Sequence, residues 1–286
     1  MNEIILQNEA PIRLGVFLGI FAAMALWEAV APRRRRIAPT ALRWLSNLTL
    51  VAVNTAVLRL AFPLLAVGMA ALSAERGWGL LNQFTVPSWI AVAGSVVILD
   101  MAIYLQHVMV HAVPVFWRLH RMHHSDVDLD VTSGARFHPL EIVLSMGIKL
   151  ILVAALGPPA VAVVIFEVLL NGTSMFNHSN VRIPEALDRW LRLVVVTPDM
   201  HRVHHSIIPR ETNSNFGFNL PWWDRLFGTY RAQPEAGHGA MTLGISQFRQ
   251  HRDMWLDRLL IQPLLGKKGD YTISGVERNE SSGEGP

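Results

Sequence analysis

The residues of this chain best suited to chemistry are its histidines. Ten of the twelve histidines fall between residues 107 and 205. Eight of these form one HxxxH and two HxxHH motifs: His107, His111, His120, His123, His124, His201, His204 and His205. Offsets of three and four place the side chains of each motif on one face of a helix. Because neutral imidazole is the commonest metal ligand, three such faces meeting in space predict a site for two metal ions.

Two further histidines extend the predicted site. His178 follows a long apolar stretch, and we expect it to bind a metal or to support a ligand. His138 precedes a proline, so it is a candidate for the same role or for the cap of a helix. A ligand ring also needs a partner for its second nitrogen. Asp199, two residues before the last motif, and Asp100, on the helical face of the first motif, are candidates.

The composition predicts that much of this chain lies in a membrane. Charged residues make up 16% and apolar residues 51%, whereas soluble domains carry about 25% charged residues. Four consecutive arginines, at 33–36, follow an apolar stretch, which indicates a membrane surface and not nucleic acid as the partner. The chain has no cysteine, which excludes disulfides, cysteine zinc sites and cysteine-held iron–sulfur clusters.

Four apolar stretches are long enough to cross a bilayer: Leu14–Ala31, Ser46–Ser73, Ser88–Gln106 and Ile142–Asn171. Gly157-Pro158-Pro159 breaks the fourth, so we expect a helical hairpin whose arms are short for a full crossing. The predicted fold is an all-α polytopic membrane protein. It has three to four transmembrane helices plus the hairpin, and a cytoplasmic helical cap carries the histidine cluster.

Charge in the loops predicts the orientation. The loop between the first two stretches holds five arginines, whereas the next loop holds only Arg76, beside Glu75. Positively charged loops lie in the cytoplasm, so the third stretch brings the chain back to that side before the first motif. The clustered histidines are therefore expected on the cytoplasmic face of a bacterial inner membrane. Aromatic residues near them are expected in an interfacial belt: Phe116, Trp117, Trp222 and Trp223.

We expect four regions along the chain. Residues 1–87 form N-terminal transmembrane helices, and residues 88–235 form a catalytic domain with two metal ions. Residues 236–266 form a C-terminal cytoplasmic segment. The polar stretch 267–286, rich in Gly, Ser and Glu, is predicted to be a disordered tail.

The motifs resemble those of the fatty acid hydroxylase / sterol desaturase superfamily, which carries HxxxH, HxxHH and a final HxxHH on a few membrane helices. The similarity covers about residues 90–231 and includes Arg136–Glu141, Asn177–Asn180, Pro198–His201 and Asn215–Tyr230. It implies a non-haem di-iron centre that uses O2 to insert a hydroxyl group or a double bond into a lipid entering from the bilayer. It also implies a separate electron donor, a ferredoxin or a cytochrome b5-like protein, because no fused cytochrome b5 segment is recognisable.

Two other classes stay open as alternatives. A zinc-dependent membrane hydrolase would use a glutamate base, as in HExxH, and that motif does not occur in this sequence. A metal transporter or sensor would place its histidines at mid-bilayer depth, whereas most of these lie outside the apolar stretches. An oxygenase suits the all-histidine ligand set because imidazole resists an oxidant that would attack thiolates. The sequence does not choose among fatty acyl, sterol or hopanoid, carotenoid and ether lipid substrates.

Overall fold

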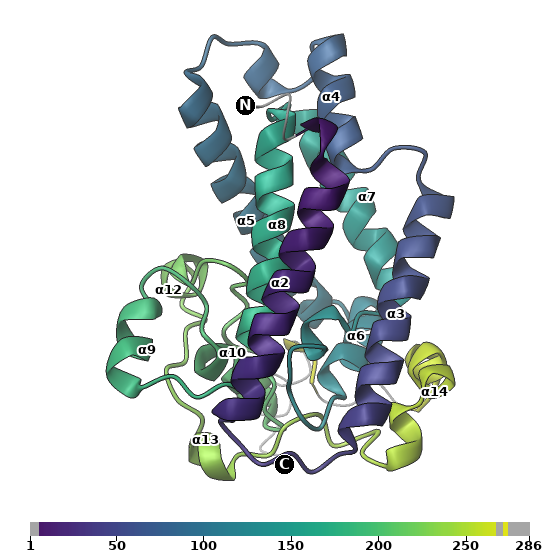
Figure 1. Cartoon of the computed structure of the whole chain (residues 1–286), viewed down its shortest axis with the longest axis vertical. Coiled ribbons are helices and arrows are strands. Elements are labelled where there is room, and N and C mark those ends of the chain that lie inside the picture. Colours follow the sequence, from purple (N-terminus) through teal and green to yellow (C-terminus); the bar gives the residue numbers. More distant parts are fainter. Residues whose placement is uncertain (1–5, 267–270, 274–286) are drawn as a thin grey trace.

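The computed structural model describes residues 6–266 and 271–273, and its regular elements there are helices. Five of the described segments are long and apolar enough to cross a membrane: Glu9–Val30, Thr40–Asn82, Ser88–Ala112, Pro139–Leu156 and Ala160–His178. They form the elongated upper part of the molecule in Figure 1, above a group of short helices. The prediction of an all-α polytopic membrane protein with a helical cap is confirmed.

The second apolar stretch contains two helices, not one. α3 (Thr40–Ala61) ends just before Pro63, and α4 (Ala66–Arg76) begins after it. Proline has no N–H to continue a helix, so the chain bends at this point. Gly77 caps the C-terminus of α4, and its left-handed backbone (φ 64°) suits glycine at that position. A 3-10 turn, η1 (Leu80–Asn82), follows.

The predicted hairpin is present, and its second arm lies at the centre of the bundle. α7 (Pro139–Leu156) and α8 (Ala160–His178) have 18 and 19 residues. At 1.5 Å per residue they are about 27 and 28 Å long, close to the thickness of a hydrocarbon core. Each arm is thus long enough to cross, contrary to the expectation of short arms. α8 is the most buried of the five segments and packs against α2 (Glu9–Val30) and α5 (Ser88–Ala112).

One buried carboxylate inside the bundle is paired with two basic residues. Glu167 of α8 lies 2.7 Å from Lys149 of α7 and 2.9 Å from Arg13 of α2. Charges inside a membrane are costly unless they are paired in this way. These ion pairs join three helices around an apolar core cluster to which α4, α5, α7 and α8 contribute.

Short helices form the cap at one end of the bundle. They are α6 (Pro114–His124), α9 (Glu185–Leu191), α10 (Pro198–His204), α11 (Pro209–Thr212), α12 (Trp222–Leu226), α13 (Gly237–Ala240) and α14 (Leu256–Ile261), with the 3-10 turns η2 (Ser133–Ala135), η3 (His251–Met254) and η4 (Gln262–Leu264). Most of the predicted tail, 267–286, lies outside the described residues. Within it Tyr271 is buried, and its ring stacks on Trp117 with centroids 5.9 Å apart. Trp117 is therefore an interior residue and not part of an interfacial belt.

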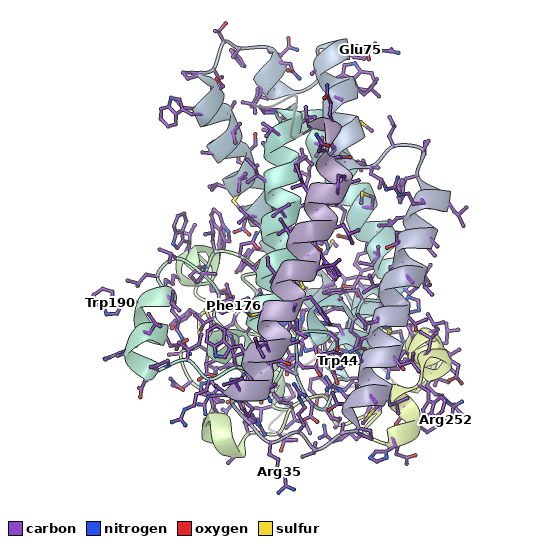
Figure 2. All side chains as sticks on the ribbon, in the orientation of Figure 1. Arg35, Trp44, Glu75, Phe176, Trp190 and Arg252 are labelled. Atoms are coloured by element: carbon purple, nitrogen blue, oxygen red, sulfur yellow. The ribbon has the colours of Figure 1, made fainter. Side chains whose placement is uncertain are left out.

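The arginine loop after α2 fastens the cap to the bundle. Arg33 contacts Asp199 at 3.1 Å, and Arg36 contacts Glu28 at 2.7 Å. Arg34 donates to the carbonyl of Met241 at 2.6 Å. The side chain of Arg35 is exposed and points away from the molecule in Figure 2. Three of these four arginines thus hold protein groups, in addition to any effect they have on membrane orientation.

Candidate metal centre

Four helices bring the motif histidines and His178 together at the cap end of the bundle. α5 carries the HxxxH motif near its C-terminus, and α6 carries the first HxxHH. α8 ends at His178, and α10 carries the second HxxHH, whose last residue, His205, is its C-cap. Proline is the first residue of both α6 and α10, where its missing N–H costs nothing. The Thr197 side chain also caps α10 by accepting from the N–H of Met200.

Nine histidines form two buried groups, in each of which ring nitrogens lie within 4.8 Å of one another. The first group is His107, His111, His120, His124 and His204. The second group is His123, His178, His201 and His205. Each HxxHH motif is divided between the groups, with its middle residue in one group and its last residue in the other. The two groups are adjacent, since the rings of His124 and His205 stack with centroids 4.5 Å apart.

Backbone carbonyls orient three of the rings. Nδ1 of His107 donates to the carbonyl of Phe216 at 2.8 Å. In the same way, His204 donates to the carbonyl of Ser214 at 2.7 Å and His178 to that of Ser174 at 2.8 Å. A carbonyl oxygen can only accept, so in the neutral ring the proton is on Nδ1 and Nε2 carries a lone pair. Each of these rings therefore presents a nitrogen that can bind a metal.

Two side chains orient further rings of the first group. Glu141 of α7 accepts from Nδ1 of His120 at 2.6 Å, and Asn213 accepts from Nδ1 of His111 at 3.1 Å. A carboxylate partner fixes the tautomer of a histidine and makes its other nitrogen a stronger ligand. Glu141 was not among the ring partners predicted from the sequence. The sequence signal that could have identified it is that Glu141 is the only carboxylate in a mostly apolar helix.

The arrangement of nitrogen atoms fits bound cations. The Nε2 atoms of His107 and His120 are 3.2 Å apart, although both rings already donate from Nδ1. Two lone pairs at this distance repel unless a positive charge lies between or beside them. Nε2 of His204 and both ring nitrogens of His205 are also buried without a hydrogen-bond partner. Buried polar atoms normally have partners, so these nitrogens are suited to a metal ion.

Burial keeps five of the cap histidines neutral. It lowers the pKa values of five rings well below their usual range, and neighbouring imidazoles lower them further: His123, His124, His201, His204 and His205. A metal ligand must be deprotonated. These five rings can therefore offer lone pairs at neutral pH without first losing protons.

His138 lies outside both histidine groups. Its Nδ1 accepts from the N–H of Leu140, which caps α7, and its Nε2 contacts the carbonyl of Leu260 at 3.0 Å. Of the two roles considered from the sequence, the structure places His138 in the helix cap.

The two carboxylates considered as ring partners have other contacts. Asp199 pairs with Arg33 and Arg202. Asp100 accepts from the indole N–H of Trp223 at 2.8 Å. Both therefore stabilise the packing around the histidines, and neither holds a ring nitrogen of the two groups.

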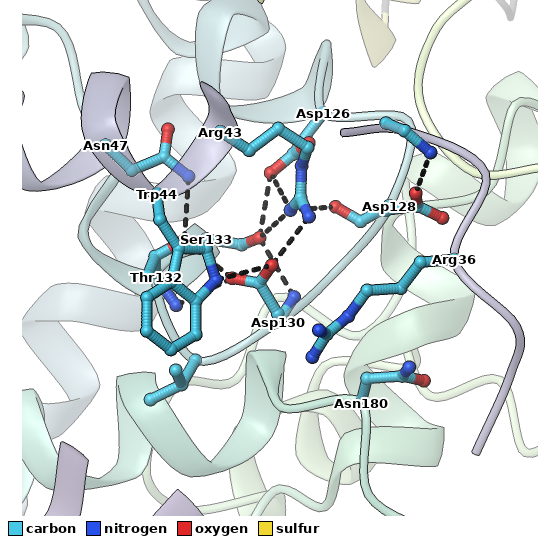
Figure 3. Close-up of polar contacts among 12 residues, drawn as sticks. Arg36, Arg43, Trp44, Asn47, Asp126, Asp128, Asp130, Thr132, Ser133 and Asn180 are labelled. Atoms are coloured by element: carbon cyan, nitrogen blue, oxygen red, sulfur yellow. Dashed lines mark hydrogen bonds and ion pairs between the residues drawn. The ribbon is translucent and has the colours of Figure 1, made fainter. Parts of the chain in front are cut away.

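A buried ion network fixes the loop that follows the first HxxHH motif (Figure 3). Arg43 of α3 donates to both carboxylate oxygens of Asp126 at 2.8 Å and to Asp130 at 2.6 Å. It also donates to the carbonyl of Asp128 and to the hydroxyl of Ser133. Every nitrogen of this guanidinium thus has an acceptor.

A second arginine completes the network. Arg136 lies 3.7 Å from Asp126 and donates to the carbonyl of Met122 at 3.0 Å. Although burial raises the pKa of Asp126, the charges of Arg43 and Arg136 lower it to about 2. Asp126 follows His124 by two residues, so the network holds the end of α6 in place. One of its arginines comes from the N-terminal part of the chain, 1–87.

Comparisons with known proteins point to one family. Residues 92–229 match the family model for fatty acid hydroxylase, and this segment contains all nine grouped histidines. An ornithine lipid hydroxylase of Rhizobium tropici is 32% identical over 138 residues, which are 48% of this chain and 41% of that protein. Human alkylglycerol monooxygenase is 29% identical over 153 residues, 52% of this chain and 32% of that protein.

A third relative has a different lipid in its name. Methylsterol monooxygenase 2-2 of Arabidopsis thaliana is 26% identical over 159 residues, 54% of this chain and 59% of that protein. Each of these matches covers less than two thirds of the relative's length. No solved structure matches this chain. The family match and the paired histidine groups agree, and residues 92–229 of this chain are similar to the fatty acid hydroxylase family.

Proposed function

We propose that this chain is a membrane-bound non-haem di-iron oxidoreductase that hydroxylates or desaturates a lipid with O2 and external electrons. The observation that carries the proposal is the pair of all-histidine groups, of five and four members, with lone pairs directed at one another. Each group would hold one iron ion. Bound iron of this kind activates O2 for attack on an unactivated C–H bond.

The protein's own groups would prepare this site. Glu141 would hold a proton on Nδ1 of His120, and the carbonyl of Phe216 would do the same for His107, so that both Nε2 atoms face the metal. The cap residues packed around the rings exclude water, since all nine histidines are buried. Excluding water protects a strong oxidant from side reactions.

The relatives' names support a lipid substrate. One is named for ornithine lipid, two others for an alkylglycerol and a methylsterol, and all three names describe a hydroxylase or monooxygenase. A cavity of about 230 Å³ lies between α5, α7 and η1, with an entirely apolar lining that includes Leu99, Ala102 and Leu152. A smaller cavity shares these three residues and extends to Gln106, next to His107. The larger cavity would accept part of a hydrocarbon chain entering from the bilayer, whereas the smaller one, of about 10 Å³, would have to widen for that chain to reach Gln106.

We further propose that the centre faces the cytoplasm of a bacterial inner membrane and receives electrons from a ferredoxin or a cytochrome b5-like protein. The excess of arginine in the loop between α2 and α3 supports this orientation. Residues 88–235 would form the catalytic domain, with residues 1–87 as N-terminal transmembrane helices.

Lipid analysis tests the proposed activity. The chain would be expressed in a host without it, and the extracted lipids compared by mass spectrometry with those from cells expressing His204→Ala. We expect lipids that have gained one oxygen or lost two hydrogens with the natural chain alone. Metal analysis of the purified protein should give about two irons per chain.

A matched control separates the centre from other histidines. His251 is exposed and lies in η3, outside both groups, so His251→Ala should leave lipid products and iron content unchanged. Full lipid conversion by His204→Ala, or identical lipids with and without the natural chain in the presence of bound iron and a reductant, would contradict the proposal.

A further inference from the structure

An apolar surface on the cap is formed by α9, α12 and the link that follows α9. Its exposed side chains are Leu187, Trp190, Leu193, Val194, Trp222, Leu226 and Phe227. Leu226 is 69% exposed and Trp190 is 73% exposed. Trp190 points away from the molecule in Figure 2. Soluble surfaces seldom gather so many large apolar side chains, so we call these seven residues the α9–α12 surface and consider what covers it.

Contacts with α5 fix the height of this surface along the bundle. The indole N–H of Trp223 donates to Asp100 at 2.8 Å, and the ring of Phe227 stacks on Tyr104 with centroids 5.4 Å apart. The Tyr104 hydroxyl also lies 3.0 Å from the Thr229 hydroxyl. α12 therefore lies beside the lower half of α5, as Figure 1 shows.

That position is inside the membrane-spanning part of α5. Asp100 comes twelve residues after Ser88, which is about 18 Å along the helix. A hydrocarbon core of about 30 Å that begins near Ser88 would extend about 12 Å beyond Asp100. Ile98 and Leu105 of α5 are 42% and 49% exposed at this level, as expected for lipid-facing residues. The α9–α12 surface thus lies at the same level along α5 as these lipid-facing residues.

Backbone groups at the exposed ends of α9 and α12 have hydrogen-bond partners, as a hydrocarbon environment requires because unpaired polar groups are very costly there. The N–H of Phe227 donates to the carbonyl of Trp223 at 2.8 Å, and the N–H of Leu193 donates to that of Trp190 at 3.1 Å. The carbonyl of Leu193 accepts from the indole of Trp222 at 2.7 Å. This last contact joins the two halves of the surface, so they would enter a membrane as one unit.

We propose that the α9–α12 surface is inserted into the leaflet on the histidine side of the membrane, with α12 in hydrocarbon and Trp190 near the head groups. The partner is the acyl region of the lipid, not another protein. The side of the cap that carries α9 and α12 would then be embedded in the membrane. Insertion of this surface depends on no property of the metal centre, so it can be tested independently of the proposed function.

Depth measurements test this proposal directly. The chain has no cysteine, so a single cysteine can carry a spin label without any background. Labels at Leu226→Cys and Val194→Cys would be compared in lipid nanodiscs with Ile98→Cys on α5 and Arg35→Cys on the exposed loop. We expect the first two to be relaxed by dissolved O2 and protected from a water-soluble nickel chelate, as at Ile98. Accessibility to the chelate equal to that at Arg35 would overturn the proposal.

A second measurement covers the case in which a labelled variant does not fold. Brominated acyl chains quench tryptophans that reach the hydrocarbon, so they should quench part of the emission of the natural chain in vesicles. Trp222→Phe should lower that quenched part measurably. An unchanged quenched part would show that Trp222 does not reach the acyl chains and would also overturn the proposal.

Discussion

Two buried polar clusters lie next to each other at the cap end of the bundle, and they are stabilised in opposite ways. In the network of Arg43, Arg136, Asp126 and Asp130, two positive charges face two negative charges. In the histidine centre, imidazole nitrogens face one another, and several of them have no hydrogen-bond partner. The network is complete within the protein. These nitrogens of the histidine centre lack partners within the protein, and bound cations would supply them. We therefore assign metal ions to this centre.

The largest expected effect comes from opening the centre. His204→Ala removes a proposed ligand from the five-member group. It should abolish activity and lower the metal content to about half or less, because the remaining rings would no longer complete the shell. Membrane insertion should be unaffected. Metal analysis and lipid products measure both effects, with His251→Ala as the control. Activity retained in His204→Ala would mean that the two clusters differ less than we infer.

Removing Arg43 from the buried ion network should mainly lower the stability of the fold. Arg43→Met leaves Asp126 and Asp130 buried without their main partner, which typically costs about 3–5 kcal/mol. The thermal midpoint of unfolding in detergent should fall clearly, with or without added iron. Arg35→Met is the matched control, because Arg35 is exposed. An unchanged midpoint in Arg43→Met would show that the network is not needed to hold α3 against the cap.

A smaller effect is expected at the contact between Glu141 and His120. Glu141→Leu should weaken metal binding or activity about 10- to 100-fold, because the ring loses the group that fixes its tautomer. Glu141→Gln keeps an acceptor oxygen and should recover most of the loss. Metal titration of the apoprotein measures the affinities. Equal affinity in the Leu and natural proteins would remove Glu141 from the support of the centre.

The smallest expected effect is at His138, which caps α7. His138→Ala should cost about 1 kcal/mol of stability, as is typical when a helix cap is lost, and should leave the metal content unchanged. His138→Asn keeps a capping oxygen and should be closer to the natural protein. A loss of bound metal in His138→Ala would place this residue within the centre after all.

The sequence predicted the histidine set well because its signal is local. Spacings of three and four define a helical face without any tertiary information, and they identified eight of the nine grouped histidines. His178, the ninth, carries no motif and was selected from its place after an apolar stretch. The break at Gly157-Pro158-Pro159 was equally local, since proline chemistry alone stops a helix there.

The division of the histidines into five and four was decided by tertiary structure. It depends on the angles at which α5, α6, α8 and α10 meet, and no spacing in one helix encodes those angles. The hydrogen-bond partners of the rings could not be predicted from the sequence either. Phe216, Ser214 and Ser174 accept through backbone carbonyls, which every residue possesses. The charge of Arg43 was visible in the sequence, but its partners lie more than 80 residues away. Sequence alone thus determined which histidines are candidates for the chemistry, and long-range packing determined which atoms they face.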